Sequence, residues 1–381
     1  MIKNLPYGKQ TIETADIEAV VDVLKSDYLT QGPKVKEFEH KFGEKIKNPL
    51  CSALCNATAG LHITYQALGL QQGDVLWTVP NSFVATANAA RFLGADVDFV
   101  DIDPDTFCIS IDALKLKLKQ TTKLPKIVVP VHFAGASCDM KEIYKLSLQY
   151  GFKIVEDAAH AVGAYYDDSP IGSCKYSDAA VFSFHPVKII TTGEGGMVAV
   201  KDKNVHDNIQ QLLTHGITKD HHKMENKSEG AWFYEMQFLG YNYRITDIQA
   251  ALGISQLSRL DENIKRRKQI AEIYHDAFHN LPVKLQKIGD DIESSWHLFV
   301  LLLKNEQERR KVFDSLRSIN IYAQIHYIPI HTQPYYRKLG FNWGDFPIAE
   351  DYYKKCISIP MYHGLTNEEQ AHVIATLKAL L

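Results

Sequence analysis

The sequence predicts an α/β protein in which a largely parallel sheet, covered by helices on both faces, precedes a smaller α+β domain. Three observations support this fold class. Short apolar runs alternate with helical patterns between about residues 50 and 200. The run from 246 to 278 lacks proline and has a helical pattern long enough to join two domains. The length of 381 residues also exceeds what one hydrophobic core usually supports.

The alternation gives the elements of the larger domain in order. Strand-like runs are DVLWTV (74–79), DVDFVDI (96–102), KIVVPVHF (126–133) and FKIVEDAAH (152–160), and helices are predicted at 56–70, 82–94, 111–120 and 140–151. Repeated strand–helix–strand units imply a mostly parallel sheet. In such sheets ligands bind beyond the carboxyl ends of the strands, so polar residues that follow the strands are the candidates for a site.

A domain boundary is predicted near residue 250, with a large domain over 1–250 and a small C-terminal domain over 251–381. The small domain is expected to contain strands at 297–303 and 321–328 and helices at 306–317 and 366–380. The polar segment TKDHHKMENKSEGAW (218–232) is typical of a surface loop.

Composition argues against several classes of function. A formal net charge of -3 gives no electrostatic reason to expect a nucleic acid or an anionic membrane as partner. The first residues, MIKNLPYGKQ, lack the apolar core of a signal peptide, and no apolar run is long enough for a membrane span, so we expect a cytoplasmic protein. Cys51 and Cys55 have no second pair at zinc-binding spacing, so we expect no metal and interpret the six cysteines as buried free thiols.

Two residues with catalytic potential follow neighbouring buried runs. FKIVEDAAH contains Glu156 and Asp157 at its end, and AAVFSF (179–184) ends shortly before Lys188. A lysine can form a Schiff base with pyridoxal phosphate (PLP), and a carboxylate can keep the pyridine nitrogen of PLP protonated. Taken alone, Lys188 is more typical of a solvated loop residue, and Asp157 of a strand terminator or a supporting hydrogen-bond acceptor.

A phosphate group would need backbone amides and hydroxyls at the start of a helix. The motif NATAG supplies Asn56 as a cap, Ala57 as a small residue that permits close approach, and Thr58 with an amide and a hydroxyl. Phe83, at the opening of the next helix, is predicted to lie on the cofactor ring, and Ser183 to add a phosphate contact. Each residue also has a plainer interpretation, as a helix cap or a core side chain. Their shared position at one sheet edge favours the site.

Nine segments in order carry a family resemblance. They are YLTQGPKVKEFE, NATAGLH, SFVATANAA, VDFVDIDPDTF, VPVHFAG, VEDAAHAVGA, FSFHPVKIITTGEGG, GYNYRITDIQAALGISQL and AQIHYIPIHTQPYY. Together they resemble the sugar aminotransferases of the DegT/DnrJ/EryC1/StrS family over essentially the whole chain. That family consists of fold-type-I PLP-dependent transferases. The chain departs from the family pattern at Gly60 and Asn81.

The resemblance implies a role for each residue that matches a family position. Lys188 corresponds to the Schiff-base lysine, Asp157 to the partner of the pyridine nitrogen, His160 to the residue that meets the phenolic oxygen of PLP, and Phe83 to the ring-stacking position. Some relatives carry histidine in place of the lysine and are dehydratases. Because Lys188 is retained, the resemblance favours transamination.

The phosphate-binding positions of the family match Ala57, Thr58 and Ser183. Asn242, in GYNYR, matches an asparagine that reaches the phosphate of the neighbouring subunit's cofactor. The resemblance therefore implies a homodimer with shared active sites.

Substrate is the least specific part of the prediction. The combination PYGKQ, SDYLTQGP, SFHPVKIITT, HGITKD and AQIHYIPIH is most similar to family members of pseudaminic acid biosynthesis. This resemblance implies a UDP-linked 4-keto sugar as acceptor and L-glutamate as amino donor. Other family members act on precursors of bacillosamine, perosamine or 4-amino-arabinose. The predicted substrate-binding residues are Tyr28, Thr30, Gln31, Arg244, His326 and Tyr327, with Arg244 assigned to the donor carboxylate.

Two other classes of protein are less consistent with the sequence. A PLP-binding regulator would need a DNA-binding module, and no basic helix-turn-helix segment remains outside the two domains. A nicotinamide oxidoreductase would need GxGxxG in the first strand–helix turn, which here reads CNATAG.

Overall fold

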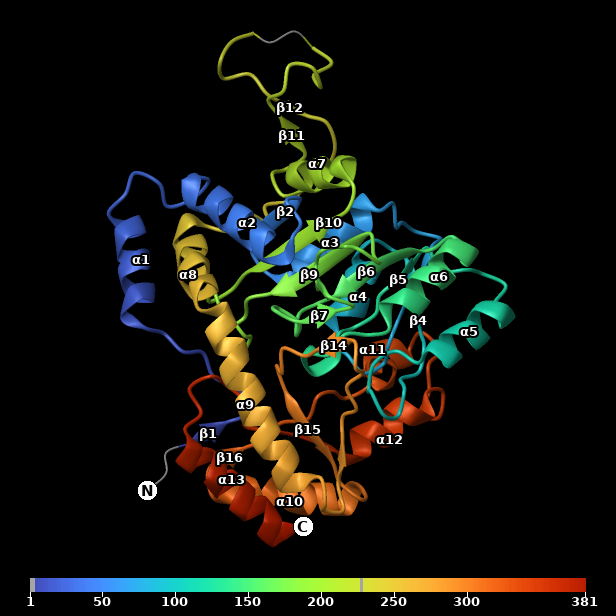
Figure 1. Cartoon of the computed structure of the whole chain (residues 1–381). Coiled ribbons are helices and arrows are strands. Elements are labelled where there is room, and N and C mark those ends of the chain that lie inside the picture. The colour runs from blue at the N-terminus through green and yellow to red at the C-terminus, as the bar shows by residue number, and fades with distance from the viewer. Residues whose placement is uncertain (1–3, 227–228) are drawn as a thin grey trace.

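The computed structural model describes residues 4–226 and 229–381, and its centre is a seven-stranded sheet (Figure 1). The strands are β2 (Cys51–Leu54), β3 (Val75–Thr78), β4 (Asp96–Phe99), β5 (Ile127–Val128), β6 (Lys153–Asp157), β9 (Ala179–Ser183) and β10 (Gly196–Val200). Their order is β2-β10-β9-β6-β5-β3-β4, and within this sheet β10 alone runs antiparallel to its neighbours. The prediction of a largely parallel sheet is confirmed.

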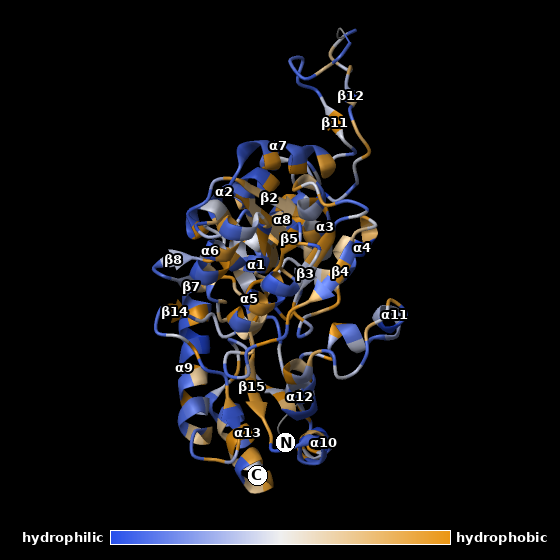
Figure 2. Cartoon of the chain, turned by 90° about the vertical axis from the view of Figure 1, so that its right-hand side faces the viewer, coloured by the Kyte–Doolittle hydropathy of each residue, from blue (hydrophilic) through white to orange (hydrophobic). Residues whose placement is uncertain are grey.

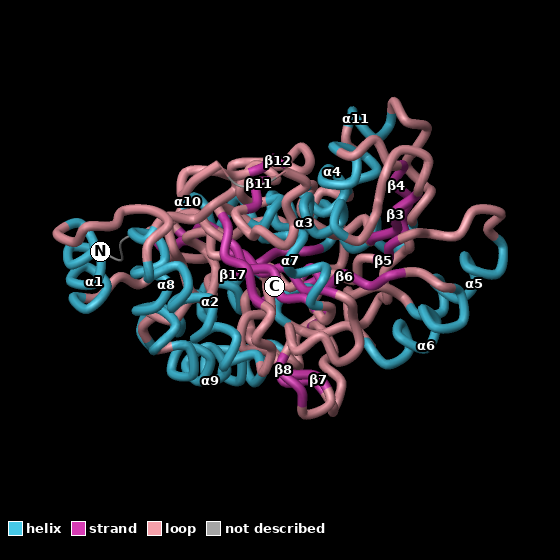
Figure 3. Tube along the Cα trace, turned by 90° about the horizontal axis from the view of Figure 1, so that it is seen from above, coloured by secondary structure: helices cyan, strands magenta, loops and turns pink. Residues whose placement is uncertain are grey.

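Helices cover both faces of this sheet. Strands such as β9 and β10 are therefore buried along their whole length. Viewed from above, α3 (Ala57–Ala67) and α4 (Ala85–Phe92) lie on one side of the strands, and α2 (Pro33–Ile46), α5 (Ile111–Gln120) and α6 (Met140–Tyr150) lie on the other (Figure 3). Apolar residues are concentrated on the central strands, as the hydropathy colouring of Figure 2 shows.

The prediction of one helix over 246–278 is wrong, because the structure has two helices there. α8 (Asp247–Ser258) and α9 (Leu260–Phe278) meet at Arg259, whose backbone angles (φ -104°, ψ 10°) leave the helical region. The Arg259 guanidinium lies 2.8 Å from the buried carboxylate of Asp16 in α1 (Thr14–Leu24). The break allows α8 to pack on α1 and α2 while α9 continues to the smaller unit (Figure 1).

The smaller unit contains an antiparallel sheet in the order β13 (Lys284–Leu285), β15 (Phe299–Leu302) and β17 (Cys356–Ile359). It also contains α10 (Glu306–Ser318), α11 (Pro334–Arg337), α12 (Pro347–Lys355) and α13 (Asn367–Leu380). A second hydrophobic core joins residues of α9, β15 and α13, including Ile270, Phe299 and Val373.

The start of the chain belongs to this second core. Leu5 is buried in it, and β1 (Leu5–Pro6) pairs in parallel with β16 (Ile321–Tyr322). The sequence-based boundary near 250 stays a prediction, but it does not anticipate that the N-terminal strand packs with the C-terminal residues. The strand predicted over 321–328 is shorter than expected, because after one bridge at Gln324 the backbone leaves the sheet.

A hairpin formed by β11 (Ile217–Thr218) and β12 (Glu235–Met236) projects from the larger unit (Figures 1 and 2). The loop predicted over 218–232 lies within this hairpin, and its residues 227 and 228 are outside the described part of the chain. A further small sheet is formed by β7 (Tyr165–Tyr166), β8 (Ser169–Pro170) and β14 (Ile292–Glu293).

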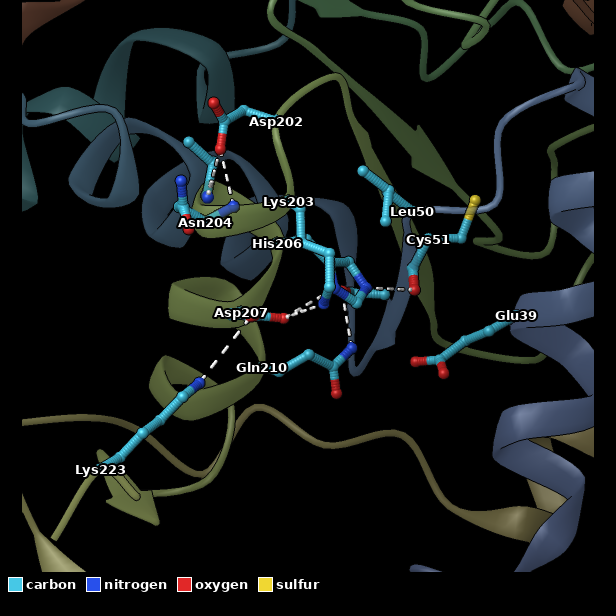
Figure 4. A network of polar contacts seen from close by, with 12 residues as sticks. Glu39, Leu50, Cys51, Asp202, Lys203, Asn204, His206, Asp207, Gln210 and Lys223 are labelled. Atoms are coloured by element: carbon cyan, nitrogen blue, oxygen red, sulfur yellow. Dashed lines mark hydrogen bonds and ion pairs between the residues drawn. The ribbon is translucent and has the colours of Figure 1, made fainter. Parts of the chain in front are cut away.

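Polar contacts attach α7 (Lys203–Leu212) to β2, and the hairpin loop to α7 (Figure 4). His206 Nε2 donates to the carbonyl of Cys51 at 3.2 Å, and Gln210 Nε2 donates to Ser52 Oγ at 2.8 Å. The Lys223 ammonium lies 3.8 Å from the Asp207 carboxylate. These contacts fix the strand that leads directly into the NATAG motif.

All six cysteines are free, and five are buried as expected, whereas Cys55 is half-buried, which departs from the prediction of six buried thiols. Among the described helices, none has the length and apolar character needed to cross a membrane.

Candidate active site

Asp157 ends β6 with its carboxylate held on both oxygens. Oδ2 accepts a 2.6 Å hydrogen bond from Thr86 Oγ1, and Oδ1 accepts from the backbone amide of Ala159 at 3.1 Å. The side chain of Thr86 also lies 2.9 Å from Ser82 Oγ. Because Asp157 is 7% exposed, these donors supply the solvation that water would otherwise give. The carboxylate therefore has a single fixed orientation.

Lys188 lies in a tight turn that follows β9. The turn is closed by the Lys188 amide, which donates to the carbonyl of His185 at 2.9 Å, and Pro186 sets the backbone at the second position. The carbonyl of Phe184 accepts from Thr191 Oγ1 and from the Thr192 amide, which returns the chain toward β10. Backbone geometry thus holds Lys188, whose side chain has no hydrogen-bond partner among residues 4–226 and 229–381.

Burial lowers the pKa of Lys188 to about 8, although the nearby Asp157 carboxylate acts in the opposite direction. Desolvation disfavours the charged ammonium, and it outweighs the attraction of the carboxylate. A substantial fraction of Lys188 is therefore neutral and nucleophilic near neutral pH, as a lysine that attacks an aldehyde must be.

The start of α3 offers unbonded amides. Asn56 caps the helix by accepting from the Ala59 amide at 2.9 Å, so the amides of Ala57 and Thr58 have no partner within the helix. Gly196 of β10 lies so close that a Cβ there would be 2.9 Å from the Ala57 nitrogen. Ser183 is the residue paired with Gly196 across the sheet, so its hydroxyl belongs to the same region. This arrangement suits an anion at the positive end of a helix.

The two departures from the family pattern have structural explanations. A Cβ at Gly60 would lie 2.9 Å from Val181 Cγ1, so glycine lets α3 pack closely on β9. Asn81 Oδ1 accepts a 3.1 Å bond from the backbone amide of Tyr327, while its buried Nδ2 has no partner among the described residues.

His160 and Tyr327 join the two units at the site. The Ala134 amide donates to His160 Nδ1 at 3.3 Å, so the ring proton belongs on Nε2, which lies 3.0 Å from Tyr327 Oη. Burial holds the pKa of His160 well below its usual range, so the ring is neutral. The ring of the buried His297 supports it at a centroid distance of 4.4 Å. If His160 Nε2–H donates, the hydroxyl proton of Tyr327 is available to another acceptor.

Phe83 is open to a ligand, whereas His326 is not. Phe83 is 60% exposed, and its ring centroid lies 6.3 Å from that of Tyr327. His326 is buried, its Nδ1 lies 2.9 Å from Ser358 Oγ, and burial lowers its pKa to about 3. Its geometry is that of a support for Tyr327, and a direct role in substrate binding stays a prediction.

The other residues predicted to bind substrate are exposed or half-buried. Tyr28, Thr30 and Gln31 are exposed in the loop between α1 and α2, where Thr30 forms a backbone bridge with Thr246. Arg244 is half-buried, and Asn242 is exposed. No polar contact joins these residues to Lys188 in the described part of the chain, so their roles remain predictions.

Sequence reasoning missed the roles of Thr86, Ser82 and His297. It also missed that Asn81 accepts a hydrogen bond from the backbone amide of Tyr327. A threonine in the first turn of the alanine-rich α4 is the only sequence signal that points to Thr86. A cavity of about 640 Å³ lies elsewhere, between α7 and the hairpin, with a lining of Gln66, Asn204, Asp207, Asn208, Gln211, Leu212, Lys223, Phe238 and Leu239. This lining includes none of the predicted cofactor residues, so the cavity is not the candidate active site. The candidate active site is defined by the side chains and backbone amides described above.

The residues present fit PLP. The amides of α3 and the Ser183 hydroxyl suit its phosphate, the open face of Phe83 suits its ring, the fixed Asp157 carboxylate suits its pyridine nitrogen, and the partly neutral Lys188 suits its aldehyde. The fold and this arrangement define the class of fold-type-I PLP-dependent enzymes.

The chain belongs to the DegT/DnrJ/EryC1/StrS aminotransferase family, whose profile matches residues 10–378. It is 39% identical to the UDP-4-amino-4,6-dideoxy-N-acetyl-beta-L-altrosamine transaminase of Campylobacter jejuni, over 99% of this chain and 97% of that protein. It is 38% identical to the spore coat polysaccharide biosynthesis protein SpsC of Bacillus subtilis, again over 99% of this chain and 97% of that protein.

Solved structures agree with this assignment. Helicobacter pylori PseC, an aminotransferase of pseudaminic acid biosynthesis, superposes with a TM-score of 0.91 at 29% identity, covering 99% of both chains. The PLP form of Spr1654 from Streptococcus pneumoniae superposes with a TM-score of 0.90 at 30% identity, over 99% of this chain and 98% of that one. The chain is thus a PLP-dependent sugar aminotransferase.

Attachment of PLP to Lys188 should depend on pH with a midpoint near 8. Because the pKa is lowered to about 8, the neutral fraction rises from about 1% at pH 6 to about half at pH 8 and about 90% at pH 9, and levels off only above that. The measurement is the rate of absorbance change when PLP is added to cofactor-free protein, divided by the rate for N-acetyl-lysine methylamide at the same pH. A relative rate that stays constant across pH 6–10 would show that Lys188 has an ordinary pKa.

Replacing Thr86 should impair catalysis through Asp157. Thr86→Val removes the 2.6 Å bond to Oδ2, and loss of such a supporting partner typically costs about 10–100-fold. We expect kcat/KM to fall by about this factor and the visible absorbance band of bound PLP to shift, because the orientation of the carboxylate controls protonation of the pyridine nitrogen. Thr86→Ser keeps the hydroxyl and should stay within about threefold of wild type. Equal losses in both variants would exclude a role for the hydroxyl.

Proposed function

We propose that this enzyme transfers the amino group of L-glutamate to the 4-keto carbon of a UDP-linked 2-acetamido-2,6-dideoxy-hexos-4-ulose, giving UDP-4-amino-4,6-dideoxy-N-acetyl-β-L-altrosamine. The placement of a partly neutral Lys188 beside a fixed Asp157 carboxylate carries the reaction type. Similarity to the Campylobacter jejuni transaminase over nearly the full length of both proteins supports this substrate.

When bound, PLP supplies an electron sink for the carbanion that forms at the amino-bearing carbon. Lys188 would move the proton between the substrate carbon and the cofactor carbon, since its lowered pKa lets it both accept and release a proton near neutral pH. Asp157 keeps a positive charge on the ring nitrogen, and Thr86 keeps Asp157 in position.

Tyr327 links this chemistry to the smaller unit. Its backbone amide is held by Asn81 and its hydroxyl meets His160, so both ends of the residue are fixed to the larger unit. With the proton of His160 on Nε2, His160 donates to the Tyr327 hydroxyl, and the hydroxyl keeps its own proton for a ligand. Tyr327 would then donate to the phenolic oxygen of PLP, and His160, which the resemblance assigns to that oxygen, would orient Tyr327.

An alternative acceptor is another nucleotide-linked 4-keto sugar, of the bacillosamine, perosamine or 4-amino-arabinose type. The chain is 38% identical to SpsC, a protein named for spore coat polysaccharide, and 39% identical to the Campylobacter jejuni transaminase. Because these identities are nearly equal, sequence identity alone does not select the acceptor sugar, and this alternative is kept. A non-catalytic PLP-binding regulator is the alternative from a different class. Such a regulator would need a DNA-binding module in addition to the PLP site, and no basic helix-turn-helix segment remains outside the two predicted domains.

We also propose a homodimer with shared active sites. Asn242 is exposed in one chain, and its side chain has no polar partner among the described residues. The projecting hairpin exposes several large apolar side chains, namely Trp232, Tyr234, Met236 and Leu239. Exposed apolar groups of this size are typical of a protein interface. The six free cysteines suit a reducing compartment, and we propose the cytoplasm.

Single-turnover measurements should identify the acceptor. The protein is converted to its pyridoxamine form with L-glutamate, freed of excess donor, and mixed with one UDP-linked 4-keto sugar at a time while the absorbance of PLP returns. We expect the fastest return with the L-arabino-configured ketosugar, and none with Lys188→Ala. A faster return with a D-configured ketosugar would move the enzyme to another pathway. No return with any ketosugar would contradict the aminotransferase assignment.

Mixed dimers should test whether Asn242 acts across the interface. Lys188→Ala lacks the lysine, and Asn242→Asp places a carboxylate against the phosphate, so each variant alone should be nearly inactive. After the variants are denatured together and refolded, random pairing makes half of the dimers mixed, and one of the two sites in each is native. We therefore expect about a quarter of wild-type activity. If Asn242 served its own chain, the mixture would stay inactive.

A further inference from the structure

Three potential metal ligands lie together at the end of α9, on the surface of the smaller unit (Figure 1). His275, Asp276 and His279 are all exposed, and they offer one ligand atom each within 4.8 Å of one another. His275 and His279 are four residues apart, which places them one above the other on one helix face. Their rings are nearly parallel, at 3°, with centroids 5.9 Å apart.

Hydrogen bonds orient one of the two imidazoles. His279 Nδ1 lies 3.2 Å from the carbonyl oxygen of His275 and 3.0 Å from that of Asp276. Because a carbonyl can only accept, Nδ1 carries the proton and Nε2 keeps its lone pair. Histidines that bind metals are commonly held in this way, with the second ring nitrogen donating to a carbonyl. The ring is therefore already in a ligating tautomer.

The local charge favours a cation. The carbonyls at the C-terminal end of α9 carry the negative end of the helix dipole. Asp276 and Glu272, one turn earlier, have no ion-pair partner among the described residues, so their charge is not compensated by a lysine or arginine. Two imidazoles, a carboxylate and a negative helix end thus share one exposed surface.

We propose that His275, Asp276 and His279 bind one divalent transition-metal ion of the zinc class. Imidazole nitrogens and a carboxylate oxygen are zinc ligands, and water completes a four-coordinate shell. The ion would cross-link the last turn of the helix that joins the two units. This site is separate from Lys188 and is independent of the proposed transamination.

Titration of the PLP-loaded enzyme with Zn²⁺ in a calorimeter tests the site. We expect one equivalent bound with micromolar affinity and, at a hundredfold excess over the dissociation constant, a rise in Tm of about 2–4 °C. His275→Asn and His279→Asn should each weaken binding. Loss of a supporting partner alone costs about 10–100-fold in metal affinity, so loss of a ligand should cost at least as much. All three ligands are exposed, so these variants should fold normally.

The adjacent pair His221 and His222 provides a matched control, because it is exposed but lies in the hairpin loop. A variant with both replaced by asparagine should bind Zn²⁺ with unchanged affinity and show the same rise in Tm. The proposal is overturned if the equivalent is absent from the wild-type enzyme. It is also overturned if the His275→Asn/His279→Asn double variant still binds one equivalent of Zn²⁺. Loss of Zn²⁺ binding in the hairpin control would overturn it as well.

Discussion

The register between β6 and β9 is the constraint on which the site depends. Asp157 pairs with Val181, so β9 passes the level of the carboxylate before the turn at 185–188 returns the chain and places Lys188 near it. Because side chains alternate along a strand, a slip of one residue would turn Asp157 to the opposite face of the sheet. β9 is buried along its whole length and β6 is buried from Ile154 to Asp157, so that slip would be costly.

Opposing electrostatic effects then set the chemistry of Lys188. Desolvation favours the neutral amine and the Asp157 carboxylate favours the ammonium, and desolvation is the larger effect. Thr86 and the Ala159 amide hold the two oxygens of Asp157, and no side-chain hydrogen bond joins this carboxylate to Lys188 in the described part of the chain.

Residues that act through local sequence were predictable, and those that act through tertiary contacts were not. The strand ends, the Asn56 cap and the apolar periodicity place Asp157, Lys188 and Thr58 at one sheet edge, because strand direction alone brings them together. Thr86 and Asn81 act on partners 71 and 246 residues away, and no short pattern encodes such pairs. The break at Arg259 occurs where its guanidinium pairs with Asp16 of α1, a contact between distant residues that the continuous helical pattern does not reveal.

The pairing of β1 with β16 has a consequence for how the chain is completed during synthesis. Leu5 emerges from the ribosome early, but its sheet partner Ile321 and much of the core around it are translated only near the end. A contact of such sequence separation forms slowly, because a very long loop must close first. The larger unit can assemble while its N-terminal strand is still unpaired, and closure of the smaller unit by that strand is therefore a late step in folding.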